Sequence, residues 1–198
     1  MKNEIVSISV EQIKKETDVM HEKIKNKHFF PLFNSLKGQY SIDLAKSSKP
    51  TIIVKQIHTI VDLNKIPNQP GFYLIFTDYK NGFKDINSCT AILNNNPNAR
   101  VIYRGESYNA RTRLESHLFN DTYHRNLKSA VNRNDNYKVC IKLSENENVN
   151  LDSPSRVTEA SWYVAYHGMR KSNRTIREMA EEAFDDVFGK PIFSRDKK

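Results

Sequence analysis

The chain has 198 residues, of which 38% are hydrophobic and 27% charged, and its formal net charge at pH 7 is +8. This length allows one domain with a core and an appendage, and leaves little room for a second full domain. Residues 1–10 alternate charged and apolar positions, and no apolar run reaches the roughly 18 residues that span a bilayer, so we expect neither an export leader nor a membrane span. Two cysteines, Cys89 and Cys140, are too few for a disulfide framework and fit a reducing cytoplasm.

The positive charge has two interpretations. Lys and Arg number 31 against 23 Asp and Glu, an excess that favours contacts with phosphate groups and makes nucleic acid the leading partner. A chain rich in Lys and Asn can also be basic for compositional reasons alone. Charge by itself therefore does not decide the function.

The first part of the chain is predicted to be mostly helical. Over residues 9–27 the apolar residues are spaced as one face of an amphipathic helix: Val10, Ile13, Val19, Met20 and Ile24. A short apolar stretch at 28–38 follows, and a serine and proline break precedes the β-branched run at 51–54. We therefore expect residues 1–60 to form a helical N-terminal extension used for DNA contact or dimerisation, followed by a domain at 61–198.

Three strands are predicted in that domain. Two prolines and Gly71 lead into an aromatic and β-branched strand that runs to about Phe76. Residues 99–104 form a second strand ended by Gly105, after a long inserted loop at 77–98. Strict alternation of apolar and polar residues at 137–143 indicates a third, half-buried strand.

Three helices accompany these strands. Residues 109–119 have helical spacing, and Ser153-Pro154 is a start signal for a helix at 155–167 that Gly168 would stop. A last helix at 175–188, capped by Ser172 or Asn173, would end at Gly189. The expected fold is α/β of the α+β kind: a small, mostly antiparallel three-stranded sheet flanked by helices.

Two short motifs resemble those of the GIY-YIG nuclease family: Gly71-Phe72-Tyr73 on the first strand and Ile102-Tyr103-Arg104-Gly105 at the end of the second. Arg113 and His117 follow Tyr103 at the spacing at which that family places its helix arginine and its histidine or tyrosine. The resemblance implies metal-dependent hydrolysis of phosphodiester bonds. The stand-alone size and the inserted loop favour a restriction or phage-defence endonuclease that acts on double-stranded DNA.

The predicted catalytic residues are Tyr73, Tyr103, Arg113, His117 and Glu159. Arg113 and His117 are four apart and share one helical face, so both can address one phosphate. A guanidinium fork suits the charge that develops on a phosphodiester better than a lysine does. Removing a proton from the attacking water requires a base, and a tyrosine serves only if its pKa is lowered. Tyr73, Tyr103 and His117 are open alternatives for that role.

The resemblance also implies one divalent cation, Mg²⁺ or Mn²⁺, held by a glutamate on the helix after the third strand. Glu159 is the predicted ligand, and a carboxylate suits this hard ion. Glu182 is the alternative, because Pro191 and Ser194 follow it at a spacing similar to that in the excision-repair branch. The other histidines show no metal-binding spacing.

Further residues are predicted to contact nucleic acid: Arg104, Arg111, Arg125, Lys128, Arg133 and Asn173. A palindromic target would imply a twofold homodimer, with the N-terminal helix as one means of forming it. Two other functions compete with the nuclease. One is a catalytically silent member that binds DNA or a protein through the same surface. The other uses Tyr103-Arg104-Gly105 in nucleotide handling or ADP-ribosyl transfer.

Overall fold

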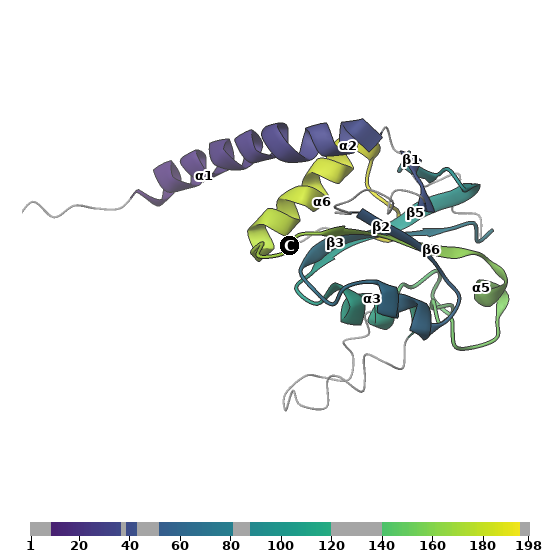
Figure 1. Cartoon of the computed structure of the whole chain (residues 1–198). Helices are drawn as coiled ribbons and strands as arrows, with labels where there is room; N and C mark the ends of the chain where they lie inside the picture. Colours follow the sequence, from purple (N-terminus) through teal and green to yellow (C-terminus); the bar gives the residue numbers. More distant parts are fainter. Residues whose placement is uncertain (1–8, 37–38, 43–51, 81–87, 120–139, 195–198) are drawn as a thin grey trace, which may run out of the picture.

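The computed structural model describes residues 9–36, 39–42, 52–80, 88–119 and 140–194 (Figure 1). At its centre is one six-stranded sheet with the strand order β1-β4-β5-β3-β6-β2. Its strands are β1 (Gln39–Tyr40), β2 (Ile52–Ile57), β3 (Gly71–Thr77), β4 (Ile92–Leu93), β5 (Asn96–Ser107) and β6 (Trp162–Gly168). Neighbouring strands are antiparallel except for the β1–β4 pair, which is parallel.

The predicted three-stranded sheet is therefore wrong. Two of the additional strands, β1 and β4, are two residues long, too short to show any periodicity in the sequence. Another, β2, lies inside the predicted helical extension and pairs with β6 along its whole length, from Ile52 opposite His167 to Ile57 opposite Trp162. The first sixty residues thus supply two strands of the sheet as well as helices.

The predicted helix at 155–167 is also wrong beyond its first turn. The four-residue helix α5 (Arg156–Glu159) ends there, and the chain continues as β6 between β3 and β2. Six of the seven β6 residues are buried, because neighbouring strands cover both edges and apolar clusters cover both faces. A strand buried on both faces loses the polar–apolar alternation that identifies strands in a sequence.

The third strand predicted at 137–143 is not part of the sheet. Residues 137–139 lie outside the described residues, and in residues 140–143 Lys142 forms an isolated antiparallel bridge with Asn148. Ile141 and Leu143 are nevertheless buried in the core, so the alternation reports burial without strand pairing. Part of the predicted inserted loop at 77–98 is β4, and its residues 81–87 lie outside the described ones.

Other elements are confirmed. The strand predicted after Gly71 is β3, the second predicted strand is β5, which continues through Gly105 to Ser107, and the helix predicted at 109–119 is α3 (Ala110–Leu118). The last predicted helix is α6 (Arg174–Phe188), where the Asn173 side chain accepts a hydrogen bond of 2.9 Å from the Ile176 amide. The predicted N-terminal helix is α1 (Val10–Ile24).

Helices cover both faces of the sheet (Figure 1). The π-helical turn η1 (Lys25–Phe29), α2 (Phe30–Leu36) and α6 cover one face, where the rings of Phe33, Phe72 and Phe184 pack together. On the other face α3 and the 3-10 helix η3 (Ile60–Lys65) enclose a second apolar cluster with Tyr73 and Leu114. In the described part of the chain, none of the helices is long and apolar enough to cross a membrane.

Candidate active site

A glycine opposite a tyrosine shapes the site on β3 and β5. The antiparallel register places Tyr73 directly opposite Gly105. A Cβ atom on residue 105 would lie 2.6 Å from the Tyr73 hydroxyl oxygen, closer than side-chain atoms pack. The Tyr73 ring therefore lies across Gly105 because that residue has no side chain, and the Tyr103 ring stacks near it with centroids 6.4 Å apart.

Helix α3 brings two further side chains to these tyrosines. The Tyr73 hydroxyl oxygen lies 3.0 Å from His117 Nε2, and the His117 ring centroid lies 4.5 Å from that of Tyr103. Arg113, one turn before His117, hydrogen-bonds Tyr73. Tyr73 and His117 are buried, whereas Tyr103 and Arg113 are half-buried. The structure thus brings together four of the predicted site residues, and two of them can reach a substrate from solvent.

Burial controls the protonation of Tyr73. Desolvation raises the pKa of Tyr73 well above its usual value, and the neighbouring Tyr103 acts in the same direction. Arg113 acts in the opposite direction. Tyr73 therefore holds its proton at neutral pH and is a hydrogen-bond donor or acceptor rather than a phenolate.

Neither predicted metal ligand lies in this cluster. Glu159 is exposed at the end of α5, where its charge contributes to the raised pKa of Tyr79. The segment after α5 is held to the C-terminal end of β3, where Asp78 accepts a hydrogen bond of 2.8 Å from the Ser161 amide. Glu182 is also exposed, and its carboxylate lies 3.8 Å from Lys25 Nζ, on the side of the N-terminal helices.

A different carboxylate, Glu181, acts electrostatically on Tyr73 although it comes from α6, which covers the other face of the sheet. It is buried, and its negative charge contributes to the raised pKa of Tyr73. Its carboxylate lies 3.3 Å from the Arg104 guanidinium, which also binds Asp185 through two nitrogens at 3.0 and 2.6 Å. Two carboxylates share one guanidinium, so these three residues carry a net charge of −1 when ionised.

The sequence contains a signal for Glu181 in the spacing of the charged residues on α6, which differs from the apolar spacing that predicts the helix. Arg177, Glu181 and Asp185 are spaced four apart on α6, so they form one row along the helix. Arg177 and Glu181 are buried, and the row lies over β5, where Arg177 Nε donates to Glu106 at 2.8 Å. Charged side chains that a helix buries against a sheet need partners of opposite charge on that sheet. Arg104 of β5 is the partner of Glu181 and Asp185, and Glu106 of β5 is the partner of Arg177.

The predicted nucleic-acid contacts have mixed positions. Arg104 is buried in the ion pairs just described, and Asn173 caps α6, so both have structural roles here. Arg111 donates from Nε to the Ile66 carbonyl at 2.8 Å and so ties α3 to the segment before β3. Three others lie outside the described residues: Arg125, Lys128 and Arg133.

Glu181 is the side chain of this site that would hold a divalent cation. Among the described residues, no group of three or more His, Cys, Asp or Glu side chains converges as a metal-binding cage. Glu181 and Asp185 together carry one negative charge more than Arg104 neutralises, so Glu181 is a carboxylate that would hold a cation if one is bound here. A single carboxylate with water in the remaining positions is a donor set that Mg²⁺ accepts.

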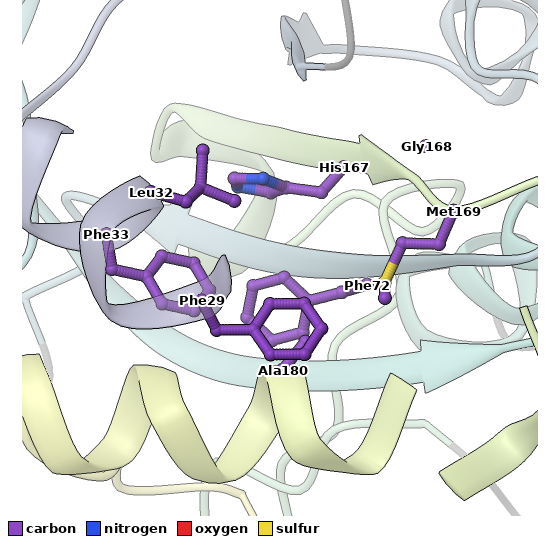
Figure 2. A pocket seen from close by; sticks show the side chains of 8 residues that line it. All are labelled: Phe29, Leu32, Phe33, Phe72, His167, Gly168, Met169 and Ala180. Carbon is purple, nitrogen blue, oxygen red and sulfur yellow. The ribbon is translucent and has the colours of Figure 1, made fainter. Parts of the chain in front are cut away.

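Another buried histidine belongs to a separate environment. His167 Nε2 on β6 lies 3.2 Å from the Tyr40 hydroxyl, and burial lowers the pKa of His167 to about 3. The ring borders an apolar pocket between η1, α2, β3 and α6, where Phe29, Phe33 and Phe72 lie close together (Figure 2). This histidine is a neutral member of the core.

Comparisons of the chain with protein-family models, with curated proteins and with solved structures yield no match. The inference of function therefore depends on the geometry and chemistry of the side chains around Tyr73.

Proposed function

We propose that this chain is a metal-dependent endonuclease that hydrolyses phosphodiester bonds in DNA, as a restriction or phage-defence enzyme of the cytoplasm. The observation that carries the proposal is the 3.0 Å contact between the Tyr73 hydroxyl and His117 Nε2, with Arg113 bonded to the same hydroxyl. These residues occur in the order and spacing of the GIY-YIG pattern, and they converge at one point of the fold.

Arg113 is the proposed phosphate-binding residue. Its guanidinium is half-buried beside Tyr73, so it can hold a phosphodiester at the edge of the site and stabilise the charge that develops during attack. Tyr103 is half-buried on the same side and would position the same phosphate.

Tyr73 and His117 form the proposed proton relay. With the His117 proton on Nδ1, Nε2 accepts the hydrogen bond from Tyr73. A water that enters beside the half-buried Tyr103 and Arg113 can then give a proton to the Tyr73 oxygen as Tyr73 passes its own proton to His117 Nε2. This transfer forms no free phenolate, which the raised pKa of Tyr73 disfavours.

Glu181 is the proposed metal ligand, in place of Glu159 and Glu182. Mg²⁺ or Mn²⁺ held there would neutralise charge on the phosphate and lower the pKa of a bound water. The proposal is supported by the burial of Glu181, its electrostatic effect on Tyr73 and the net negative charge that it shares with Asp185 and Arg104.

The test is a cleavage assay of the full chain with unmodified and modified phage DNA in Mg²⁺ or Mn²⁺. Glu181→Gln removes the carboxylate charge but keeps its shape, while Glu182→Gln and Glu159→Gln are matched controls at exposed glutamates. We expect Glu181→Gln and Arg113→Ala each to lower the cleavage rate by at least about 100-fold, with both control variants close to wild type. Circular dichroism verifies that each variant is folded.

Two outcomes would overturn parts of this proposal. Loss of cleavage in Glu159→Gln with full cleavage in Glu181→Gln would move the metal to Glu159. Absence of cleavage by wild type in either metal, combined with salt-sensitive DNA binding, would replace the nuclease by a silent DNA-binding protein.

A further inference from the structure

Among the residues that the structure describes, none covers the apolar residues of α1 from Val10 to Met20. The helix buries none of its residues, and Val10, Ile13 and Met20 expose 77%, 51% and 62% of their surface. In Figure 1 the helix projects from the sheet and its covering helices. A helix of 15 residues without packing is marginally stable in water, so a partner that covers this face would stabilise it.

The base of α1 is fixed to the rest of the fold. Lys25 directly follows the helix, and its Nζ lies 2.7 Å from Glu22 and 3.2 Å from Asp186 of α6. Ile24 packs against the apolar core beneath α6. The direction of α1 is thereby set at its C-terminal end, while the surface from Val10 to Met20 stays free for a partner.

Three exposed apolar residues, Val10, Ile13 and Met20, form a narrow seam with the polar Thr17 and the half-buried Ile24. Val10, Ile13, Thr17, Met20 and Ile24 follow each other at alternating steps of three and four residues, and at 3.6 residues per turn they fall within an arc of about 80°. Val19 lies on the opposite side of the helix. This heptad spacing is typical of a two-stranded coiled coil, whereas a helix that lies on a sheet or a membrane has a wider apolar face.

The charges on α1 favour a protein partner over a polyanion. Its acidic residues are Glu11, Glu16, Asp18 and Glu22, and its lysines are Lys14, Lys15 and Lys23. Acidic and basic groups nearly cancel, so the helix has no basic surface for DNA phosphates or acidic lipid headgroups.

The charged residues on one edge of the seam can form ion pairs with the same edge of a second copy. Glu16 and Lys23 lie seven residues apart, each directly before a seam residue, and so on the same edge. We propose that α1 is a dimerisation helix that forms an antiparallel, two-stranded coiled coil with α1 of a second copy of this chain. Ile13 then packs against the part of Ile24 of the other copy that its own core leaves exposed, and Thr17 packs against Met20. In this register Glu16 of each copy lies beside Lys23 of the other, which gives two symmetry-related ion pairs.

The oligomeric state of the full chain tests this proposal. Sedimentation analysis over a range of concentrations should show the 23.0 kDa wild type approaching twice its mass. The double variant Ile13→Lys/Met20→Lys should raise the dimer dissociation constant at least about tenfold. Val19→Lys adds one lysine charge at a residue 64% exposed on the opposite side, and it should leave the dimer unchanged. A wild type that stays monomeric, or equal dissociation by Val19→Lys, overturns the proposal.

Charge reversal tests the orientation. Glu16→Lys and Lys23→Glu should each weaken self-association, and the double variant Glu16→Lys/Lys23→Glu should restore it, because both pairs re-form with reversed charges. A parallel coiled coil does not place Glu16 beside Lys23. Failure of the double variant to recover would therefore overturn the antiparallel pairing. None of these measurements depends on nuclease activity.

Discussion

The Tyr73 hydroxyl oxygen lies 3.0 Å from His117 Nε2, although the two residues are 44 positions apart in the chain. Tyr73 reaches this point from the centre of the sheet and His117 from α3, which covers that face. The contact joins the hydroxyl of a buried tyrosine, which keeps its proton at neutral pH, to the imidazole of a buried histidine. The effect of this contact on cleavage can be measured separately from its effect on the stability of the fold.

Tyr73→Phe should impair cleavage more than folding. The variant keeps the ring against Gly105 but removes the hydroxyl, so His117 loses this hydrogen bond in a buried place. We expect a loss of stability of about 1–3 kcal/mol and a fall in kcat of at least about 100-fold. Urea unfolding and steady-state cleavage of labelled DNA measure the two effects. Equal activity of Tyr73→Phe and wild type would exclude the relay.

Gly105→Ala should disrupt the same site by steric conflict. The new methyl group would lie 2.6 Å from the Tyr73 hydroxyl oxygen and 2.7 Å from Cζ, and the Tyr73 ring is fully buried. We expect a destabilisation of about 1–3 kcal/mol from overpacking, together with a loss of cleavage. Thermal unfolding monitored by circular dichroism gives the stability. Combining it with Tyr73→Ala should relieve the conflict, so the double variant should lose less stability than the sum of the two single changes.

Arg104→Met should be among the most destabilising changes on β5. It would leave Glu181 and Asp185 without the guanidinium that both bind, in a place where Arg104 and Glu181 are buried. Removing one partner of a buried ion pair costs about 3–5 kcal/mol. Chemical denaturation should therefore show a large shift that Arg104→Met/Glu181→Gln partly reverses. A shift below about 1 kcal/mol would show that these ion pairs contribute little.

His167 should make the protein less stable at acidic pH than at neutral pH. Its folded pKa of about 3 lies below the ordinary value of 6.5, so the unfolded chain binds a proton that the folded chain excludes. This contribution to stability is complete above pH 6.5 and decreases by up to about 1.4 kcal/mol per pH unit as the pH falls towards 3. Urea unfolding at pH 7 and pH 5 should show a smaller decrease in His167→Gln than in wild type. His58→Gln, at an exposed histidine, is the control and should follow the wild type.

The local patterns in the sequence were sufficient for several elements. Strand β3 follows two prolines and a glycine, α3 has regular helical spacing, and α6 begins at a capping asparagine and ends at Gly189, which has a φ of 82°. Each of these signals depends on residues within a few positions of one another. The spacing of Arg113 and His117 on one helical face also required no tertiary information.

The sequence by itself determined these local elements and the order of the two tyrosines, the arginine and the histidine. Only the tertiary structure decided that residues 162–168 form a strand, because strand pairing on both edges outweighs the helical start signal at Ser153-Pro154. It also decided which carboxylate acts on Tyr73. Glu181 and Glu182 are adjacent in the chain, but α6 rests on the sheet through one side, so one carboxylate is buried against Arg104 and its neighbour is exposed. Packing between distant elements fixed both results: the spacing of Arg177, Glu181 and Asp185 marks one charged side of α6, but the sequence does not say which element that side faces.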